Sequence, residues 1–138
     1  MRLYNIHGQL QNKKVTKYLI NWSKPSRSNL QFRVKNFFKI YWENQIVYEE
    51  FPVFGSKMKI DILNATKKIA VEVQGPQHFA FNKFFHKDSR SNYLGSIKRD
   101  LQKAQWLEKN GFSLLELEGD DLDKLSPSYL SDRFNILI

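Results

Sequence analysis

The chain has 138 residues, with 22 Lys and Arg against 14 Asp and Glu, which gives a formal net charge of +8. This length suffices for one compact domain, and the 41% hydrophobic content argues against a disordered or fibrous protein. The lack of Cys excludes disulfide frameworks, thiolate zinc sites and cysteine nucleophiles. Without an apolar leader or a membrane-length apolar run, the sequence predicts a soluble, intracellular and cytoplasmic protein that has no signal peptide and no membrane contact.

The positive charge is unevenly distributed along the chain. Residues 1–107 hold 19 basic and 7 acidic residues, whereas residues 108–138 hold 3 and 7. A net charge of +12 in the first segment favours a polyanion as the partner, although a merely solvated basic surface explains the charge equally well. The acids between 116 and 123 are typical of a solvated loop rather than a metal site.

Two helices are predicted in the first third of the chain. Apolar residues at helical spacing predict a short helix over 14–22, followed by a linker at 23–28. Ser28 is placed to cap a second helix over 29–43, whose apolar stripe recurs every three to four residues. This stripe is expected to face the core.

The remaining chain predicts a sheet with a crossover. Short β-branched and aromatic runs at 45–54, 57–63 and 69–75 predict three strands joined by tight turns. Residues 76–95 are expected to form a long ordered loop with helical turns, and 97–110 a helix whose apolar face carries Ile97, Leu101, Ala104 and Leu107. A fourth strand at 112–118 would join the same sheet through this helix. The tail from 120 is expected to form a short helix or turn and a docked end.

Acidic residues are predicted to converge where these strands pair. A turn between Thr66 and Lys67 pairs residues whose numbers sum to 133, so Asp61 faces Glu72 on one sheet face. The preceding turn gives a sum near 111 and places Glu50 beside Asp61. The neighbouring apolar residues, Ile60, Ile62, Val71 and Val73, are expected on the opposite face.

Such a row of carboxylates suits Mg²⁺ or Mn²⁺, because hard cations prefer oxygen ligands. The alternative is a polar sheet face whose acids pair with Lys57, Lys59 and Lys68.

These residues resemble a known family. Asp61 followed by Glu72-Val73-Gln74 on consecutive strands, after an N-terminal helix, is similar to the PD-(D/E)XK nuclease superfamily. The run VEVQGPQH and the later RDLQKAQWLEKNGFSLLEL resemble the small very-short-patch-repair-like and homing-endonuclease-like subgroup. The resemblance implies an α/β fold with a restriction-endonuclease-like core, namely a mixed four-stranded sheet flanked by helices. It also implies one domain, 1–138, with an N-terminal extension (1–27), a catalytic core (28–118) and a C-terminal tail (119–138).

The resemblance implies that Asp61 and Glu72, with Glu50 beside them, bind Mg²⁺ or Mn²⁺, and that the Val73 carbonyl completes the protein's ligands. Gln74 replaces the usual lysine, so either Gln74 orients the attacking water or Lys103 or Lys98 reaches the site from the following helix. Gln31 lies near the place of the family's helix-borne acid, and His78 would polarise water or contact the scissile phosphate. The expected DNA-binding residues are Lys98, Arg99, Lys83, Lys87 and Arg90.

The activity implied is hydrolysis of DNA phosphodiester bonds by a metal-dependent endonuclease. Cutting both strands of a duplex needs two active sites, so a homodimer is expected, whereas a monomer would nick. Two alternatives stay open: a resolvase for Holliday junctions or other branched DNA, and a non-catalytic DNA-binding module, which the missing lysine favours.

Overall fold

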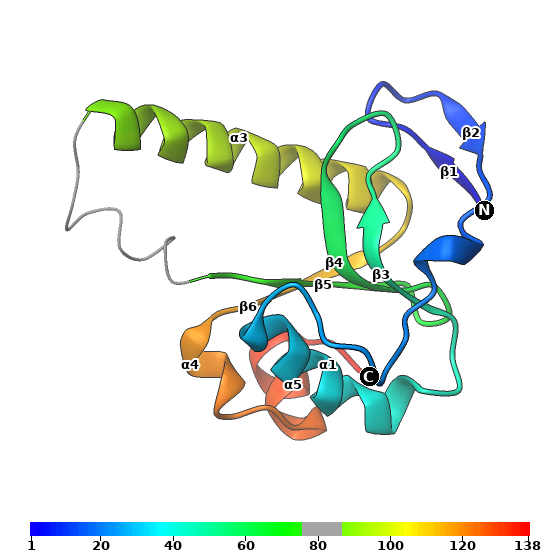
Figure 1. Cartoon of the computed structure of the whole chain (residues 1–138), viewed down its shortest axis with the longest axis vertical. Coiled ribbons are helices and arrows are strands. Elements are labelled where there is room, and N and C mark those ends of the chain that lie inside the picture. The colour runs from blue at the N-terminus through cyan, green and yellow to red at the C-terminus, as the bar shows by residue number, and fades with distance from the viewer. Residues whose placement is uncertain (76–86) are drawn as a thin grey trace.

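A mixed four-stranded sheet with the strand order β3-β4-β5-β6 forms the centre of the computed structural model (Figure 1), which describes residues 1–75 and 87–138 and, for 87–93, the backbone alone. The strands are β3 (Val47–Pro52), β4 (Lys59–Asn64), β5 (Ile69–Val73) and β6 (Ser113–Leu117). The first three strands pair antiparallel, and β6 pairs parallel to β5. The predicted meander and the fourth strand added through a crossover are therefore confirmed.

Helices cover both faces of this sheet (Figure 1). Helix α1 (Asn29–Trp42) begins where predicted, because the Ser28 side chain accepts a hydrogen bond from the backbone N–H of Gln31 at 3.1 Å. Helix α1 lies on the same side of the sheet as α4 (Gly119–Leu122) and α5 (Pro127–Phe134), and α3 (Lys87–Lys109) lies on the other side. None of the helices in the described part of the chain is both long enough and apolar enough to cross a membrane.

Helix α3 is longer than predicted. It begins at Lys87 rather than 97, so the expectation of a loop is wrong for 87–95, and residues 76–86 lie outside the described residues. Leu107 of the predicted apolar face is buried, but Ile97 and Leu101 are exposed. Among the side chains of α3 that the structure describes, the buried ones are therefore those of Trp106 and Leu107 near its end.

The N-terminal residues form a hairpin that the sequence did not indicate. Strands β1 (Arg2–Tyr4) and β2 (Leu10–Asn12) pair antiparallel, and the Trp106 indole N–H donates to the Tyr4 carbonyl at 2.6 Å. The predicted helix over 14–22 is wrong, because only a single 3-10 turn, η1 (Thr16–Tyr18), forms there. The chain after η1 bonds instead to the edge of β3, where the Ile20 N–H donates to the Val47 carbonyl.

The face alternation of β3 and β4 slips by one residue at Glu50 and Asp61. Tyr48 and Phe51 belong to one buried cluster, on the α3 side, although they are three residues apart, and the same holds for Ile60 and Leu63. Ile62 packs in the other cluster, on the α1 side, so the expectation that Ile60 and Ile62 share a face is wrong. Glu50 has a positive φ of 52°, which breaks the regular pleat.

Candidate functional site

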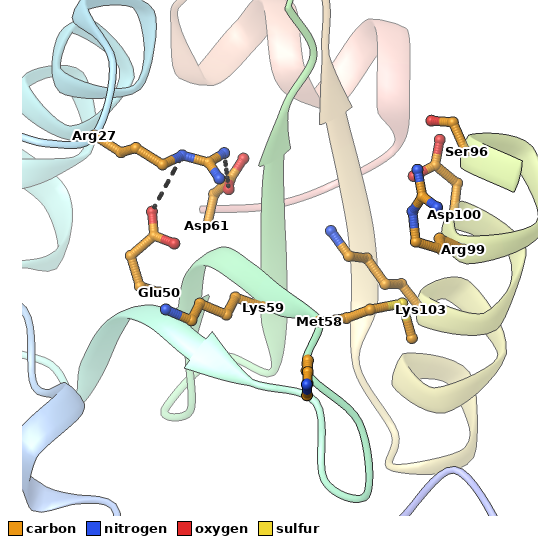
Figure 2. Close-up of a pocket in the computed structure, with 10 residues that line it drawn as sticks. Arg27, Glu50, Met58, Lys59, Asp61, Ser96, Arg99, Asp100 and Lys103 are labelled. Atoms are coloured by element: carbon orange, nitrogen blue, oxygen red, sulfur yellow. Dashed lines mark hydrogen bonds and ion pairs between the residues drawn. The ribbon is translucent and has the colours of Figure 1, made fainter. Parts of the chain in front are cut away.

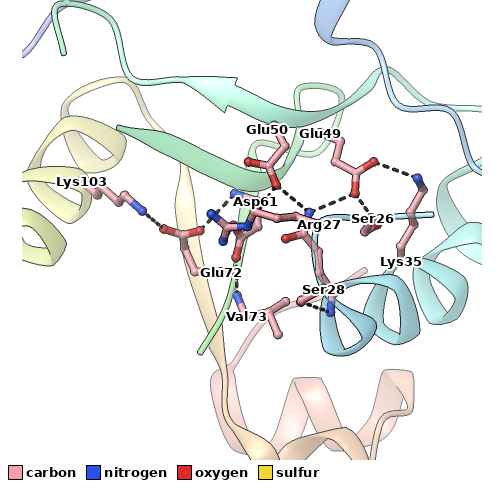
Figure 3. A network of polar contacts seen from close by, with 11 residues as sticks. Ser26, Arg27, Ser28, Lys35, Glu49, Glu50, Asp61, Glu72, Val73 and Lys103 are labelled. Atoms are coloured by element: carbon pink, nitrogen blue, oxygen red, sulfur yellow. Dashed lines mark hydrogen bonds and ion pairs between the residues drawn. The ribbon is translucent and has the colours of Figure 1, made fainter. Parts of the chain in front are cut away.

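Asp61 and Glu72 meet at the end of the β4–β5 ladder. The observed pairs, from Ile62 with Val71 to Asn64 with Ile69, follow the predicted register. Beyond Ile62 the two side chains complete the pairing: Glu72 Oε2 accepts from the Asp61 N–H at 3.0 Å, and Asp61 Oδ2 accepts from the Val73 N–H at 2.8 Å (Figure 3). The predicted convergence of these two acids is therefore present.

Burial changes the acidity of this pair. Asp61 is 6% exposed and Glu72 is 8% exposed. Burial, followed by the charge of Glu72, raises the pKa of Asp61 to about 8, and the hydrogen bond from the Val73 N–H only partly opposes this rise. Two buried carboxyls in contact have a strong tendency to share a proton or to bind a cation.

Lys103 reaches this pair from helix α3. Its ammonium group donates to Glu72 Oε1 at 2.8 Å, and its side chain is 21% exposed (Figure 3). A lysine contributed by the following helix was one of the two sequence-based interpretations. The other, Gln74, directly follows β5; its backbone N–H bonds to the Leu117 carbonyl, and its side chain has no hydrogen bond among the described residues.

Glu50 joins the acids through α1 and the segment before it. Glu50 Oε1 accepts from the Gln31 amide at 3.1 Å and lies 3.9 Å from Arg27 Nε. Arg27 Nη2 also lies 3.5 Å from Asp61 Oδ1. The sequence indicates Glu50 and Gln31 near the site but not Arg27, which belongs to the segment 23–28 with its linker-like composition.

A second buried network supports this arrangement, and the sequence reasoning missed it. Glu49 accepts hydrogen bonds from Lys35 Nζ at 2.8 Å, Ser26 Oγ at 2.5 Å and Gln31 Nε2 at 3.0 Å. Lys35 is fully buried, and its ammonium also donates to the Lys24 carbonyl at 2.8 Å. The available signal was the spacing of Gln31 and Lys35, which lie one helical turn apart on the sheet-facing side of α1.

Glu50 and Asp61 line a cleft of about 570 Å³ between the β3–β4 hairpin and α3 (Figure 2), and Glu72 is not among its lining residues. Its lining mixes acids with bases from three parts of the chain. The lining residues are Arg27, Glu50, Lys57, Met58, Lys59, Asp61, Ser96, Arg99, Asp100 and Lys103. The cleft therefore has a small acidic centre with cationic side chains around it.

The other predicted site residues are placed as follows. Arg99 lines the cleft, whereas Lys98 is exposed on α3 and is not among the lining residues. His78 and Lys83, and the side chains of Lys87 and Arg90, lie outside the described residues. Their predicted roles stay predictions.

The acidic run near the C-terminus has a structural role at Asp121, which corrects the expectation of a solvated loop there. Asp121 is buried and accepts hydrogen bonds from the Tyr129 hydroxyl and the Arg133 guanidinium. Burial opposes ionisation, but the hydrogen bonds from Tyr129, the Glu118 N–H and Arg133 outweigh it and lower the pKa of Asp121.

Within the described residues, no group of three or more His, Cys, Asp or Glu side chains is arranged to hold a metal ion. Asp61 and Glu72 nevertheless fit a hard divalent cation by their chemistry, because Mg²⁺ commonly takes one or two carboxylates and completes its shell with water and phosphate. The buried, mutually repelling carboxyls supply that oxygen set.

Two viral proteins are similar to half of the chain. Over 66 residues, 48% of this chain, it is 36% identical to "Uncharacterized protein 033L" of Invertebrate iridescent virus 3 and 32% identical to "Uncharacterized protein 094L" of Frog virus 3 (isolate Goorha). The chain spans 34% and 43% of these curated relatives, less than half of either. No family model matches the chain, and no solved structure shows a significant match.

Proposed function

We propose that the chain is a divalent-metal-dependent DNA endonuclease with a restriction-endonuclease-like core of the PD-(D/E)XK type. The observation that carries the proposal is the contact of buried Asp61 and Glu72 at the end of the β4–β5 ladder, with Lys103 on Glu72. A sheet that buries two facing acids loses stability through desolvation and repulsion. Selection for a cation-dependent reaction accounts for such a cost.

Asp61 and Glu72 would hold the cation, with Glu50 beside them at the cleft. A bound Mg²⁺ or Mn²⁺ would supply an activated water at neutral pH and stabilise the charge that develops on the phosphate. Lys103 orients Glu72 and lines the cleft, so its ammonium is placed to stabilise negative charge there. In this proposal Lys103 takes the role of the lysine that Gln74 replaces.

The cleft walls support DNA as the substrate. Lys59 lines the cleft from β4 and Arg99 from α3, so cationic side chains line opposite walls (Figure 2), and Lys57 also belongs to the lining. Lysine and arginine side chains bind phosphates and release condensed counterions. A strand that enters the cleft would have its backbone held on both sides of the acidic centre.

The test is a cleavage assay with supercoiled plasmid and Mg²⁺ or Mn²⁺. Wild type is expected to convert the plasmid to nicked or linear DNA, whereas Asp61→Ala and Glu72→Ala are expected to leave it intact. Asp120→Ala, which removes an exposed acid on α4, serves as the matched control. Cleavage that persists in both site variants would show that the assigned site is wrong.

A non-catalytic DNA-binding module is the second candidate, because the acids of the site already have basic partners, Arg27 and Lys103. Binding of plasmid and of a four-way junction, without cleavage of either in any metal, would favour this candidate. Cleavage restricted to the four-way junction would instead identify a branched-DNA resolvase. A gel-shift assay on the same samples measures binding separately from cutting.

A further inference from the structure

The Arg27 guanidinium lies over the carboxylates that the proposed function assigns to a cation. Asp61 Oδ2 is bonded to the Val73 N–H, and Arg27 lies 3.5 Å from the other oxygen, Oδ1. Arg27 Nε lies 3.9 Å from Glu50 Oε1 (Figure 3). Arg27 therefore covers the Asp61 oxygen that the β-sheet leaves available.

The backbone on both sides of Arg27 is held by neighbouring side chains, whereas the Arg27 side chain is mostly exposed. On one side, Ser26 Oγ donates to Glu49 at 2.5 Å; on the other, Ser28 caps helix α1. The Arg27 side chain itself is 69% exposed. The chain thus holds the Arg27 backbone beside the cleft, while most of its side chain faces solvent.

The two basic partners of the site differ in strength. The Lys103–Glu72 pair is short, at 2.8 Å, and mostly buried. The two contacts of Arg27 are long and involve an exposed guanidinium, and exposed ion pairs contribute little to stability. A cation that enters the site would therefore displace Arg27 before Lys103.

We propose that Arg27 is an exchangeable counter-ion: it pairs with Glu50 and Asp61 when no metal is bound, and it turns to a DNA phosphate at the cleft when a divalent cation takes its place. This inference rests on the proposed function. It makes Arg27 a DNA-binding residue whose contact with a phosphate depends on metal.

The first test measures Mn²⁺ affinity by isothermal titration calorimetry without DNA. Arg27→Ala is expected to bind Mn²⁺ about two- to fivefold tighter than wild type, because no exposed ion pair has to be broken. Lys59→Ala is the matched control, since Lys59 lines the same cleft without an ion pair to a described residue. Lys59→Ala removes the same charge as Arg27→Ala but is expected to change the Mn²⁺ affinity less. This difference between the two variants should persist at high salt, because salt screens distant charges.

The second test measures DNA affinity by fluorescence anisotropy in EDTA and in Ca²⁺, after a check that Ca²⁺ does not support cleavage. Arg27→Ala is expected to bind DNA about tenfold more weakly than wild type in Ca²⁺, the loss of one charged hydrogen bond, and almost equally in EDTA. Equal weakening in both conditions would contradict the exchange.

The outcomes separate this inference from the function on which it rests. If wild type binds Mn²⁺ and Asp61→Ala does not, but Arg27→Ala binds as wild type does, the exchange is wrong and the metal site stands. An equal gain in Arg27→Ala and Lys59→Ala would also overturn the exchange, because it would reflect long-range charge alone. If wild type binds no Mn²⁺, both proposals fail.

Discussion

The carboxyl group of Asp61 occupies a place where an antiparallel sheet normally has a main-chain hydrogen bond. It accepts from the Val73 N–H, while the Asp61 N–H is satisfied by Glu72. The strands are thereby held apart by two side chains that repel one another when both are ionised. Main-chain pairing and the proposed cation binding thus depend on the same carboxyl group, so a replacement that keeps its acceptor but not its charge separates stability from activity.

The raised pKa of Asp61 makes stability depend on pH. An unfolded Asp ionises near pH 4 and the folded Asp61 near pH 8, so the folded state retains a proton that the unfolded state has lost. Stability is therefore expected to fall as pH rises through this window in the absence of metal. Asp61→Asn, which keeps a side-chain acceptor for the Val73 N–H, should melt a few degrees above wild type at pH 8.

Thermal melts in EDTA at pH 5 and pH 8 would check this prediction. The difference between Asp61→Asn and wild type should shrink at pH 5, because the unfolded carboxyl, only about one unit above its pKa, then gains much less free energy from ionisation than it does at pH 8. Asp120→Asn removes an exposed acid and should show no such pH-dependent difference. A wild type that melts higher at pH 8 than Asp61→Asn would contradict the raised pKa.

Lys103 is the second residue whose replacement is informative. Lys103→Gln is expected to lower the cleavage rate by about 100-fold or more, because it removes a positioned charge or proton carrier next to Glu72. Lys103→Arg keeps the charge but remains protonated at any accessible pH. Partial activity in Lys103→Arg would indicate an electrostatic role, and its absence a proton-transfer role.

Single-turnover rates at saturating metal would measure both variants. Lys39→Gln, on helix α1, is the matched control and is expected to retain the wild-type rate. Full activity of Lys103→Gln would contradict a catalytic role for this side chain. Gln74 would then be the remaining candidate for orienting the attacking water.

At the scale of elements, the slip in β3 and β4 shapes the cleft. Glu50 adopts a left-handed φ of 52°. Tyr48 and Phe51, three residues apart, therefore face the same side of the sheet, whereas in a regular strand they would face opposite sides. The β3–β4 hairpin consequently bends toward α3, which forms the opposite wall (Figure 1). A strained residue at a candidate site is consistent with function, since strain of this kind persists only where the surroundings hold it.

Glu50→Gly tests this strain. The substitution is expected to stabilise the protein by up to about 1 kcal/mol, because glycine adopts positive φ without cost, while it weakens Mn²⁺ binding through loss of the carboxylate. Lys68→Gly is a suitable control, since Lys68 has a φ of 60° in the β4–β5 turn, away from the cleft lining. It should give a similar gain without any change in Mn²⁺ binding.

Urea unfolding and calorimetry on the two variants would measure these effects. Clear destabilisation of Glu50→Gly alone would mean that the bond between Gln31 and Glu50 outweighs the strain.

The strand register was predictable from the sequence, because short turns leave few pairings and both turns were marked by Gly55-Ser56 and Thr66-Lys67. The site pair Asp61 and Glu72 followed from that register alone. The slip at Glu50 was not predictable, since a positive φ at a glutamate has no sequence signal.

Two other features depended on tertiary contacts that local patterns do not contain. Residues after η1 pair with the edge of β3, so their helical spacing was overridden. Lys35 belongs to the buried face of α1 because Glu49 and the Lys24 carbonyl satisfy its charge. A hydrophobic pattern treats a lysine as exposed and thus misses a buried ion pair.

At the scale of the whole molecule, the acids of α4 lie on the side of the sheet away from the cleft. The net negative segment 108–138 includes α4 and α5, which lie on the α1 side of the sheet (Figure 1). The cleft is lined by Lys57, Lys59 and, from α3 on the other side, Arg99. The acids of α4 therefore do not face a polyanion that approaches the cleft, which favours this orientation.

The dependence of DNA binding on salt should identify this orientation. Each lysine that neutralises a phosphate adds nearly one unit to the slope of log affinity against log salt, so Lys59→Gln should lower the magnitude of that slope by about one. Lys124→Gln makes the same charge change next to α4, in the acidic segment, and should leave the slope unaltered. Anisotropy titrations across a salt series in EDTA would measure both. Equal slopes for wild type and both variants would mean that DNA is bound elsewhere. If DNA lies in the cleft, Lys59→Gln removes one of its phosphate contacts and the slope has to change.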